Sequence, residues 1–332
     1  MKAIASQVIV WHHIAYFGPM PETARALVPA IIDGLRAYGL LAVPIFLVTG
    51  GFLAARAISG AGARLALPVL IGRRYRRLAP PYLAALVAAV AGAWLARSVA
   101  PHPENPLAPG MAQIFAHVAL LQDVLGYEAL SAGIWYVAID FQLFVLLAFL
   151  AWVSRAGTTG ESRSSSRWVG LSLAVTLLSL FWLNLDPELE IWAPYFFGAY
   201  GFGILAERIS RLDARGPAIA ALAVLAGIAL MVEWRPRILI AAATAVVLAW
   251  TGGRGPRQFE TRPVSLLGDI SYGLFLIHYP VALTVGAVVT ALAPNDASSA
   301  VAGLMAAWLL SLAAGTALHR IIEVGLASPR RR

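Results

Sequence analysis

The chain alternates long apolar runs with short polar connections almost from end to end. An α-helix needs about 20 apolar residues to cross the hydrocarbon core of a bilayer. The pattern therefore predicts an all-α integral membrane protein, a bundle of about ten transmembrane helices. We expect the spans near residues 3–19, 37–57, 78–97, 132–153, 168–185, 191–206, 217–232, 236–252, 266–291 and 299–319.

Two polar stretches interrupt this pattern without indicating a second domain. Residues 111–127 carry Gln113, His117 and Asp123, which makes them too polar to span, so we expect an interfacial or re-entrant helix there. The Ser- and Gly-rich stretch 156–167 is typical of a flexible linker. We expect residues 1–332 to form a single transmembrane domain with no appended soluble domain.

The basic residues predict the orientation of the bundle. With the N-terminus inside and ten alternating spans, the outer side keeps only five of the 25 Lys and Arg residues: Arg25, Arg36, Arg97, Arg235 and Arg237. Such a bias toward the cytoplasmic side is what the positive-inside rule describes. Both termini are therefore expected in the cytoplasm.

Composition supports a membrane protein and argues against other classes. Apolar residues make up 60% of the chain and charged residues 13%, against about 25% charged in soluble proteins. A net charge of +8 is compatible with nucleic-acid binding, but the positive charges are scattered over inner loops and a tail. They are better explained by orientation and by affinity for anionic membrane lipid. The absence of cysteine excludes disulfides and thiolate nucleophiles.

Two adjacent histidines, His12 and His13, lie about halfway along the first predicted span. On a helix, His13 is about 16 Å from Lys2, near the middle of the bilayer, where an ionisable group costs about 2.5–3.5 kcal/mol. One interpretation is a general base or nucleophile that works near neutral pH; the other is a pair of histidines hydrogen-bonded to neighbouring helices. We expect no metal site, because adjacent helix positions diverge and no third ligand is evident.

A carboxylate, Asp140, lies inside the fourth predicted span at a depth similar to that of His13. It could orient an imidazole and stabilise its charged form, as in a catalytic dyad. A structural ion pair and a protonated Asp140 are the alternatives.

Four arginines occupy five positions of a predicted inner loop, residues 72–82: Arg73, Arg74, Arg76 and Arg77. Arginine forks suit phosphate groups, but a basic loop also serves topology and lipid head groups. The following Pro80-Pro81 is expected to start the next helix.

The ninth predicted span contains Ser271, Tyr272 and His278, the last of these just before Tyr279-Pro280. His278 is either a site residue or a hydrogen-bonded structural histidine.

In their order, these segments resemble the acyltransferase 3 family, the ten-helix membrane O-acyltransferases of bacteria. The family begins with Arg-Gly-hydrophobic-Ala and a histidine about eleven residues later, and Lys2-Ala3-Ile4-Ala5 is followed by His13. The other resemblances are Ile45–Leu53 to Phe-Phe-x-x-Ser-Gly-Phe-Leu, Arg74–Pro80 to Arg-x-x-Arg-x-x-Pro, Trp135–Phe144 to Trp-Ser-Leu-x-x-Glu-x-x-x-Tyr, and Ser271–Pro280 to Ser-Tyr-x-x-Tyr-Leu-x-His-x-Pro. Lys2 stands where the family has Arg, Asp140 where it has Glu, and the last helix lacks the usual Glu-x-Pro.

This resemblance implies a multi-pass enzyme of the bacterial cytoplasmic membrane. Its expected reaction moves an acyl group, with acetyl expected, from cytoplasmic acyl-CoA to a hydroxyl of a sugar, an exported glycan or a small glycoside. His13 would be the base or the acyl carrier, and Asp140 would orient it. Arg74 and Arg77, with Arg73 and Arg76, would meet the phosphates of the donor. A relay role for His12 is our own expectation from its place beside His13 and is not implied by the resemblance.

Two other functions remain open at this stage. A transporter or flippase of a glycan or lipid-linked sugar would use the intramembrane His and Asp as a proton relay. The second alternative function is that of a structural or regulatory subunit with a degenerate site.

Overall fold

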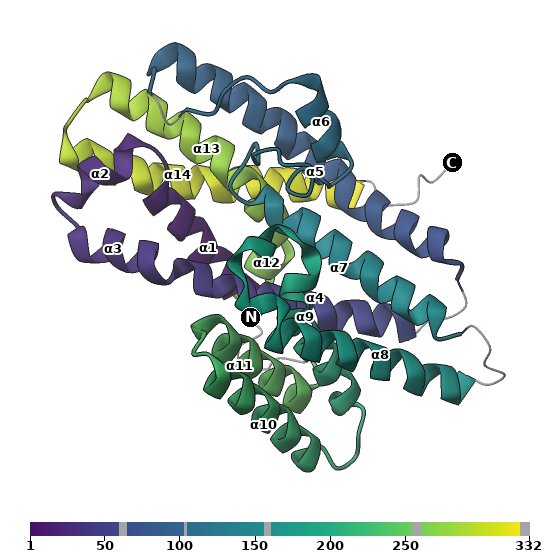
Figure 1. Cartoon of the computed structure of the whole chain (residues 1–332). Helices are drawn as coiled ribbons and strands as arrows, with labels where there is room; N and C mark the ends of the chain where they lie inside the picture. Colours follow the sequence, from purple (N-terminus) through teal and green to yellow (C-terminus); the bar gives the residue numbers. More distant parts are fainter. Residues whose placement is uncertain (60–64, 103–104, 156–160, 254–260, 326–332) are drawn as a thin grey trace. The chain divides into compact units, whose positions relative to one another are not determined.

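The computed structural model describes residues 1–59, 65–102, 105–155, 161–253 and 261–325, and every regular element in these ranges is a helix (Figure 1). The chain divides into two compact units made of separate segments. The first unit comprises Met1–Ala42, Arg77–Tyr136 and Arg262–Arg332, and the second comprises Val43–Arg76 and Val137–Thr261. Two helices, α5 (Leu67–Val99) and α7 (Ile134–Val153), contribute residues to both units.

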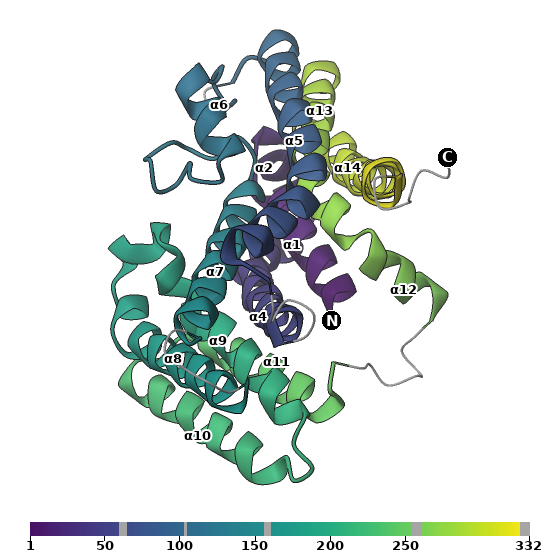
Figure 2. The same cartoon turned by 90° about the vertical axis from the view of Figure 1, so that its right-hand side faces the viewer.

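The first unit is built around two long helices, α13 and α14, which lie side by side in both views (Figures 1 and 2). α1 and α2 pack against both of them, and α3 packs against α1 and α2. The elements of this unit outside α5 and α7 are α1 (Lys2–Tyr16), α2 (Pro19–Arg25), α3 (Pro29–Tyr38), η1 (Gly39–Ala42), α6 (Met111–Val118), α12 (Arg262–Asp269), α13 (Ser271–Leu292), α14 (Ala297–Leu318) and a π-helical end, η6 (His319–Val324). Gly315 of α14 lets this helix lie close to α13, because a Cβ at Gly315 would lie 2.7 Å from the Cα of Leu274 on α13.

In the second unit, α4 packs closely on α9. A Cβ at Gly51 would lie 2.0 Å from the carbonyl oxygen of Tyr200, and one at Gly203 would lie 1.9 Å from that of Val48. Small residues of this kind let two apolar helices approach to backbone contact. The elements of this unit outside α5 and α7 are α4 (Val43–Ser59), α8 (Glu161–Phe181), η3 (Leu183–Leu185), η4 (Pro187–Ile191), α9 (Ala193–Ser210), α10 (Gly216–Val232) and α11 (Pro236–Thr251).

A buried arginine fixes the α10–α11 connection in this unit. Arg235 is 4% exposed, and its guanidinium donates to the side chain of Asn184 at 2.8 Å and to the carbonyl of Leu180 at 3.0 Å. The charge is buried, but its donors meet oxygen acceptors, as burial of such a group requires.

The helices agree with a membrane protein without confirming ten spans. Within the described ranges, six helical stretches are long and apolar enough to cross a bilayer, and α10 and α11 are apolar but shorter. The first of the six, Pro29–Ser59, runs through α3, η1 and α4. The number of spans and the cytoplasmic location of both termini stay predictions.

The predicted loop at 72–82 is wrong, because these residues lie inside the 33-residue helix α5. Pro80 and Pro81 are therefore in the helix interior instead of at its start. Each proline removes one intrahelical hydrogen bond, and the contacts of this long helix outweigh that local cost. The four arginines consequently share one helix, on which Arg76 and Arg77 lie three and four positions after Arg73, on the same face.

Three other boundaries differ from the sequence prediction. The single span predicted at 266–291 breaks at Ile270 into α12 and α13. Residues 161–167 of the predicted linker are helical, because α8 begins at Glu161, whereas 156–160 lie outside the described residues. The stretch 111–127 is helical only over the eight residues of α6, too few to span.

Several basic residues that the sequence analysis placed on the inner side lie outside the described ranges: Arg64, Arg254, Arg257, Arg330, Arg331 and Arg332.

Candidate functional site

The first unit joins two of the predicted site residues, His13 of α1 and His278 of α13, in a histidine pair. Nδ1 of His13 lies 2.7 Å from Nε2 of His278, and the two ring planes differ by only 8°. His13 is 6% exposed and His278 is fully buried. The two residues are separated by 265 positions in sequence, so the contact depends on the packing of α1 against α13.

The backbone assigns the protons of this pair. Nδ1 of His278 lies 3.3 Å from the carbonyl oxygen of Leu274, one turn earlier on α13. A carbonyl only accepts, so a neutral His278 carries its proton on Nδ1 and its lone pair on Nε2. Nδ1–H of His13 then donates to that lone pair, which leaves the lone pair of His13 on its Nε2. This assignment follows from the hydrogen-bond network.

A phenylalanine ring lies beside each histidine of the pair. Phe17 lies 5.8 Å from the ring of His13, and Phe275 lies 6.0 Å from the ring of His278, between centroids. Phe275 is itself held where Gly133 gives it room, since a Cβ at Gly133 would lie 2.9 Å from its carbonyl oxygen. The pair therefore lies in a largely apolar surrounding, where a hydrogen bond is stronger than in water.

His12, the neighbour of His13, contacts a different part of the unit. Its Nδ1 lies 2.8 Å from the carbonyl oxygen of Leu35 on α3. Its side chain also occupies the space beside Gly39, where a Cβ would lie 2.3 Å from the Cβ of His12. His13 donates its hydrogen bond to His278, and His12 instead attaches α1 to α3. Its relay role stays a prediction.

The second unit holds two further predicted site residues, Asp140 of α7 and Arg74 of α5, in an ion pair. The Arg74 side chain is 20% exposed and that of Asp140 is 9% exposed. The guanidinium of Arg74 also lies over the ring of Phe144, 5.2 Å from its centroid. One of the four arginines predicted to meet phosphates therefore already has a carboxylate partner.

Gly50 and Tyr200 complete the surroundings of Asp140. A Cβ at Gly50 would lie 2.8 Å from Oδ1 of Asp140 and 3.4 Å from the ring of Tyr200, so only glycine leaves room for the carboxylate. Tyr200 is fully buried, and its hydroxyl has no hydrogen-bond partner among the described residues. Sequence analysis missed Tyr200, because a tyrosine in an apolar helix is usually core; its position in the glycine-rich stretch 198–203 was the available signal.

The remaining predicted site residues have other environments. Arg73, Arg76 and Arg77 are exposed on α5. The hydroxyl of Ser271 donates to the carbonyl of Gly268 at 2.7 Å, across the α12–α13 break. The hydroxyl of Tyr272 donates to the carbonyl of Leu78 at 3.0 Å and so ties α13 to α5.

No metal cluster is found within the described ranges, where no three His, Asp or Glu side chains converge. The catalytic and binding roles predicted for all these residues stay predictions.

Comparison with known proteins gives one match. A family model described as an acyltransferase domain covers residues 1–319. The searches of curated proteins and of solved structures found no match. The family match includes α1, α5, α7 and α13, which carry the residues described above. Because it extends over nearly the whole chain, the chain belongs to the acyltransferase 3 family of membrane acyltransferases.

Proposed function

We propose that this chain is an O-acyltransferase that moves an acyl group, acetyl in the simplest case, from acyl-CoA to a hydroxyl of a sugar or glycoside, with Nε2 of His13 as general base. The observation that carries the proposal is the hydrogen-bond chain from His13 through His278 to the carbonyl of Leu274. This hydrogen-bond chain supports one tautomer of the His13 imidazole, in which the free lone pair is on Nε2.

The reaction balances with these groups alone. Nε2 of His13 takes the proton of the acceptor hydroxyl, and the hydroxyl oxygen attacks the thioester carbonyl. The carbon–sulfur bond then breaks, and the leaving thiolate takes the proton back from His13. His278 holds the imidazole in place and accepts its Nδ1–H, so the charge that develops on His13 is shared along the hydrogen bond. Loss of a positioned general base typically costs about 10²–10⁴-fold in rate.

Exposed arginines suit the donor. The phosphates of CoA need cations that are not already paired with a carboxylate, and Arg73, Arg76 and Arg77 are exposed on α5. Arg74, paired with Asp140, is the poorest candidate of the four for direct phosphate contact. We therefore assign the donor phosphates to the other three. Neutralising those side chains should raise the KM for acyl-CoA more than the KM for the acceptor.

The test uses the purified full chain in proteoliposomes with radiolabelled acetyl-CoA. Release of CoA and transfer of label to the protein or to added glycosides are measured for wild type, His13→Ala and His102→Ala. His102 is an exposed histidine outside the helices and serves as the matched control. We expect wild type and His102→Ala to release CoA alike, and His13→Ala to lose at least about 10²-fold.

Two outcomes would reject the proposal. Equal release of CoA by wild type and His13→Ala would remove the histidine from the chemistry. No reaction with acetyl-CoA or with longer acyl-CoA donors would favour transport of a glycan or lipid-linked sugar without acyl transfer.

A further inference from the structure

Two exposed aromatic rings mark the C-terminal end of α1. Tyr16, the last helical residue, is 55% exposed, and Phe17, the C-cap, is 41% exposed. The backbone turns away directly afterwards, because Phe17 is extended and Gly18 has φ of +80° before α2 begins at Pro19. That turn leaves both rings at the surface instead of under the next helix.

These rings are continuous with the buried histidines. Ring centroids are 5.6 Å apart for His12–Tyr16, 5.8 Å for His13–Phe17 and 5.1 Å for Tyr16–Phe17. Phe17 also contacts Tyr279 of α13 edge-on, at 5.2 Å and 85°. Phe17 is one helical turn beyond His13, about 6 Å along the axis. A molecule seated on the exposed rings therefore lies about one turn from the histidine pair.

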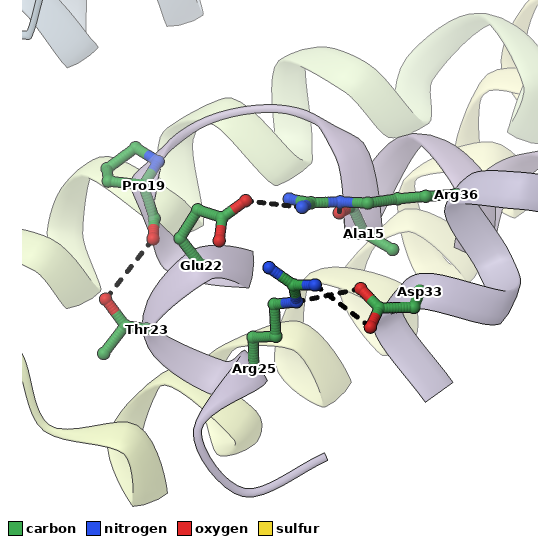
Figure 3. Close-up of polar contacts among 7 residues, drawn as sticks. All are labelled: Ala15, Pro19, Glu22, Thr23, Arg25, Asp33 and Arg36. Carbon is green, nitrogen blue, oxygen red and sulfur yellow. Dashed lines mark hydrogen bonds and ion pairs between the residues drawn. The ribbon is translucent and has the colours of Figure 1, made fainter. Parts of the chain in front are cut away.

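Charged side chains from α2 and α3 lie at the same end of α1 (Figure 3). Nε of Arg36 donates to the carbonyl oxygen of Ala15 at 2.7 Å, and the same guanidinium pairs with Glu22. Arg36 thus satisfies a carbonyl in the last turn of α1, which the helix itself leaves without a donor. The Glu22 side chain remains 56% exposed, so its carboxylate can still accept hydrogen bonds.

A second ion pair, Arg25 with Asp33 at 2.8 Å, joins α2 to α3 beside the first (Figure 3). Both side chains are 48% exposed. The end of α1 therefore combines apolar ring faces with accessible carboxylates and guanidinium groups.

This combination fits a sugar ring. One face of a pyranose presents C–H groups that pack on aromatic rings, and its hydroxyls bind carboxylates and guanidinium groups. Aromatic residues with a few convergent polar groups are typical of small-molecule sites. The competing explanation is an aromatic belt that anchors the protein at the membrane surface, which requires neither contact with buried histidines nor a charged rim.

We propose that Tyr16 and Phe17, with Glu22 and Arg36 at their rim, form the subsite that holds the sugar ring of the acceptor next to His13. The inference rests on the proposed function and extends it to the acceptor. Tyr16 and Phe17 determine which acceptor is used: a sugar benefits from the rings, whereas a small alcohol reaches His13 without them.

The experiment compares two acceptors in the acetyl-CoA assay with the full chain in proteoliposomes: methyl β-D-glucopyranoside and ethanol. The variants are Tyr16→Leu and Phe17→Leu, which keep apolar bulk and remove the ring. Tyr38→Leu is the matched control, since Tyr38 is 69% exposed at the end of α3 and would serve a belt equally well. The readout is the ratio of kcat/KM for the glucoside to kcat/KM for ethanol.

We expect this ratio to fall at least tenfold in Tyr16→Leu and in Phe17→Leu, to fall less in Phe17→Tyr, which keeps a ring, and to stay at the wild-type value in Tyr38→Leu. A variant that merely disturbed His13 would lower kcat/KM for both acceptors together and leave the ratio unchanged.

Several results would overturn the inference while leaving the proposed function intact. They are an unchanged ratio in both leucine variants, an equal fall in Tyr38→Leu, or a wild type that acetylates ethanol and not the glucoside. A wild type that releases no CoA from acetyl-CoA or from longer acyl-CoA donors, with either acceptor or with water, would reject the proposed function, and the subsite with it.

Discussion

The two buried polar clusters look alike in sequence and differ in chemistry. In the first unit, His13 and His278 are linked through a neutral hydrogen bond that ends at a backbone carbonyl. In the second unit, Asp140 and Arg74 are linked by opposite charges. The first arrangement leaves a lone pair ready to take a proton, whereas in the second each charge satisfies the other. An ionisable residue in an apolar helix therefore indicates a reactive group only when its hydrogen-bond or ion-pair partner leaves it a free lone pair.

The largest expected effect tests the structural side of this comparison. Asp140→Ala leaves the buried end of Arg74 without its carboxylate, and breaking such a pair typically costs about 3–5 kcal/mol. Thermal unfolding in detergent should show a large loss of stability. The double variant Asp140→Ala/Arg74→Met should recover most of it, because it removes both charges together.

The double variant also decides whether Asp140 is catalytic. If it folds and transfers acyl groups, the ion pair is structural. If it folds and is inactive while Arg74→Met alone is active, Asp140 belongs to the reaction, as the resemblance to the family predicted.

The next effect tests the reactive side. His278→Ala removes the acceptor of His13 Nδ1–H, so the imidazole of His13 loses both its tautomer and its orientation. We expect kcat to fall by about 10²-fold, at the lower end of the range for a general base, with little change in the KM for acyl-CoA. His278→Gln, which can still accept a hydrogen bond, should recover part of the rate; no difference between the two variants would contradict the role of the hydrogen bond.

A smaller effect concerns the helix crossing that supports the Asp140 cluster. Gly51→Ala would place a Cβ 2.0 Å from the carbonyl oxygen of Tyr200 and force α4 away from α9. Overpacking of this kind costs about 1–3 kcal/mol. Gly72→Ala is the control, because a Cβ there meets nothing within 4 Å. Equal melting temperatures for the two variants would show that the crossing is looser than described.

The smallest effect has the opposite sign. Tyr200→Phe removes a buried hydroxyl that has no partner among the described residues. Since an unsatisfied buried polar group costs about 1–3 kcal/mol, the variant should be as stable as wild type or more stable by up to about that amount. A clear loss of stability would mean that the hydroxyl is bonded to a bound molecule or water in the membrane.

Long apolar runs predicted most helices, because an α-helix needs about 20 apolar residues to cross the hydrocarbon core of a bilayer. The prediction failed where local signals opposed the packing. Pro80-Pro81 reads as a helix start, yet α5 continues through it. The break at Ile270 follows Gly268-Asp269, a short polar interruption that the sequence prediction included within one long apolar span.

The candidate site was predictable residue by residue but not as pairs. His13, Asp140 and His278 stand out because ionisable groups in apolar runs are costly. That His13 meets His278, and Asp140 meets Arg74, depends on contacts between residues 265 and 66 positions apart. Such distant contacts cannot be read from the residue pattern of a single sequence, and Tyr200 gave only the indirect signal of its glycine-rich neighbours.

The carbonyl of Leu274 has a consequence for proton conduction. A backbone carbonyl accepts a hydrogen bond but holds no proton to pass on, so the chain from His13 through His278 is closed at that end. A proton that enters at Nε2 of His13 has to leave from the same atom. The histidine pair can therefore lend and recover a proton within one reaction, but it cannot conduct protons from one side of a membrane to the other.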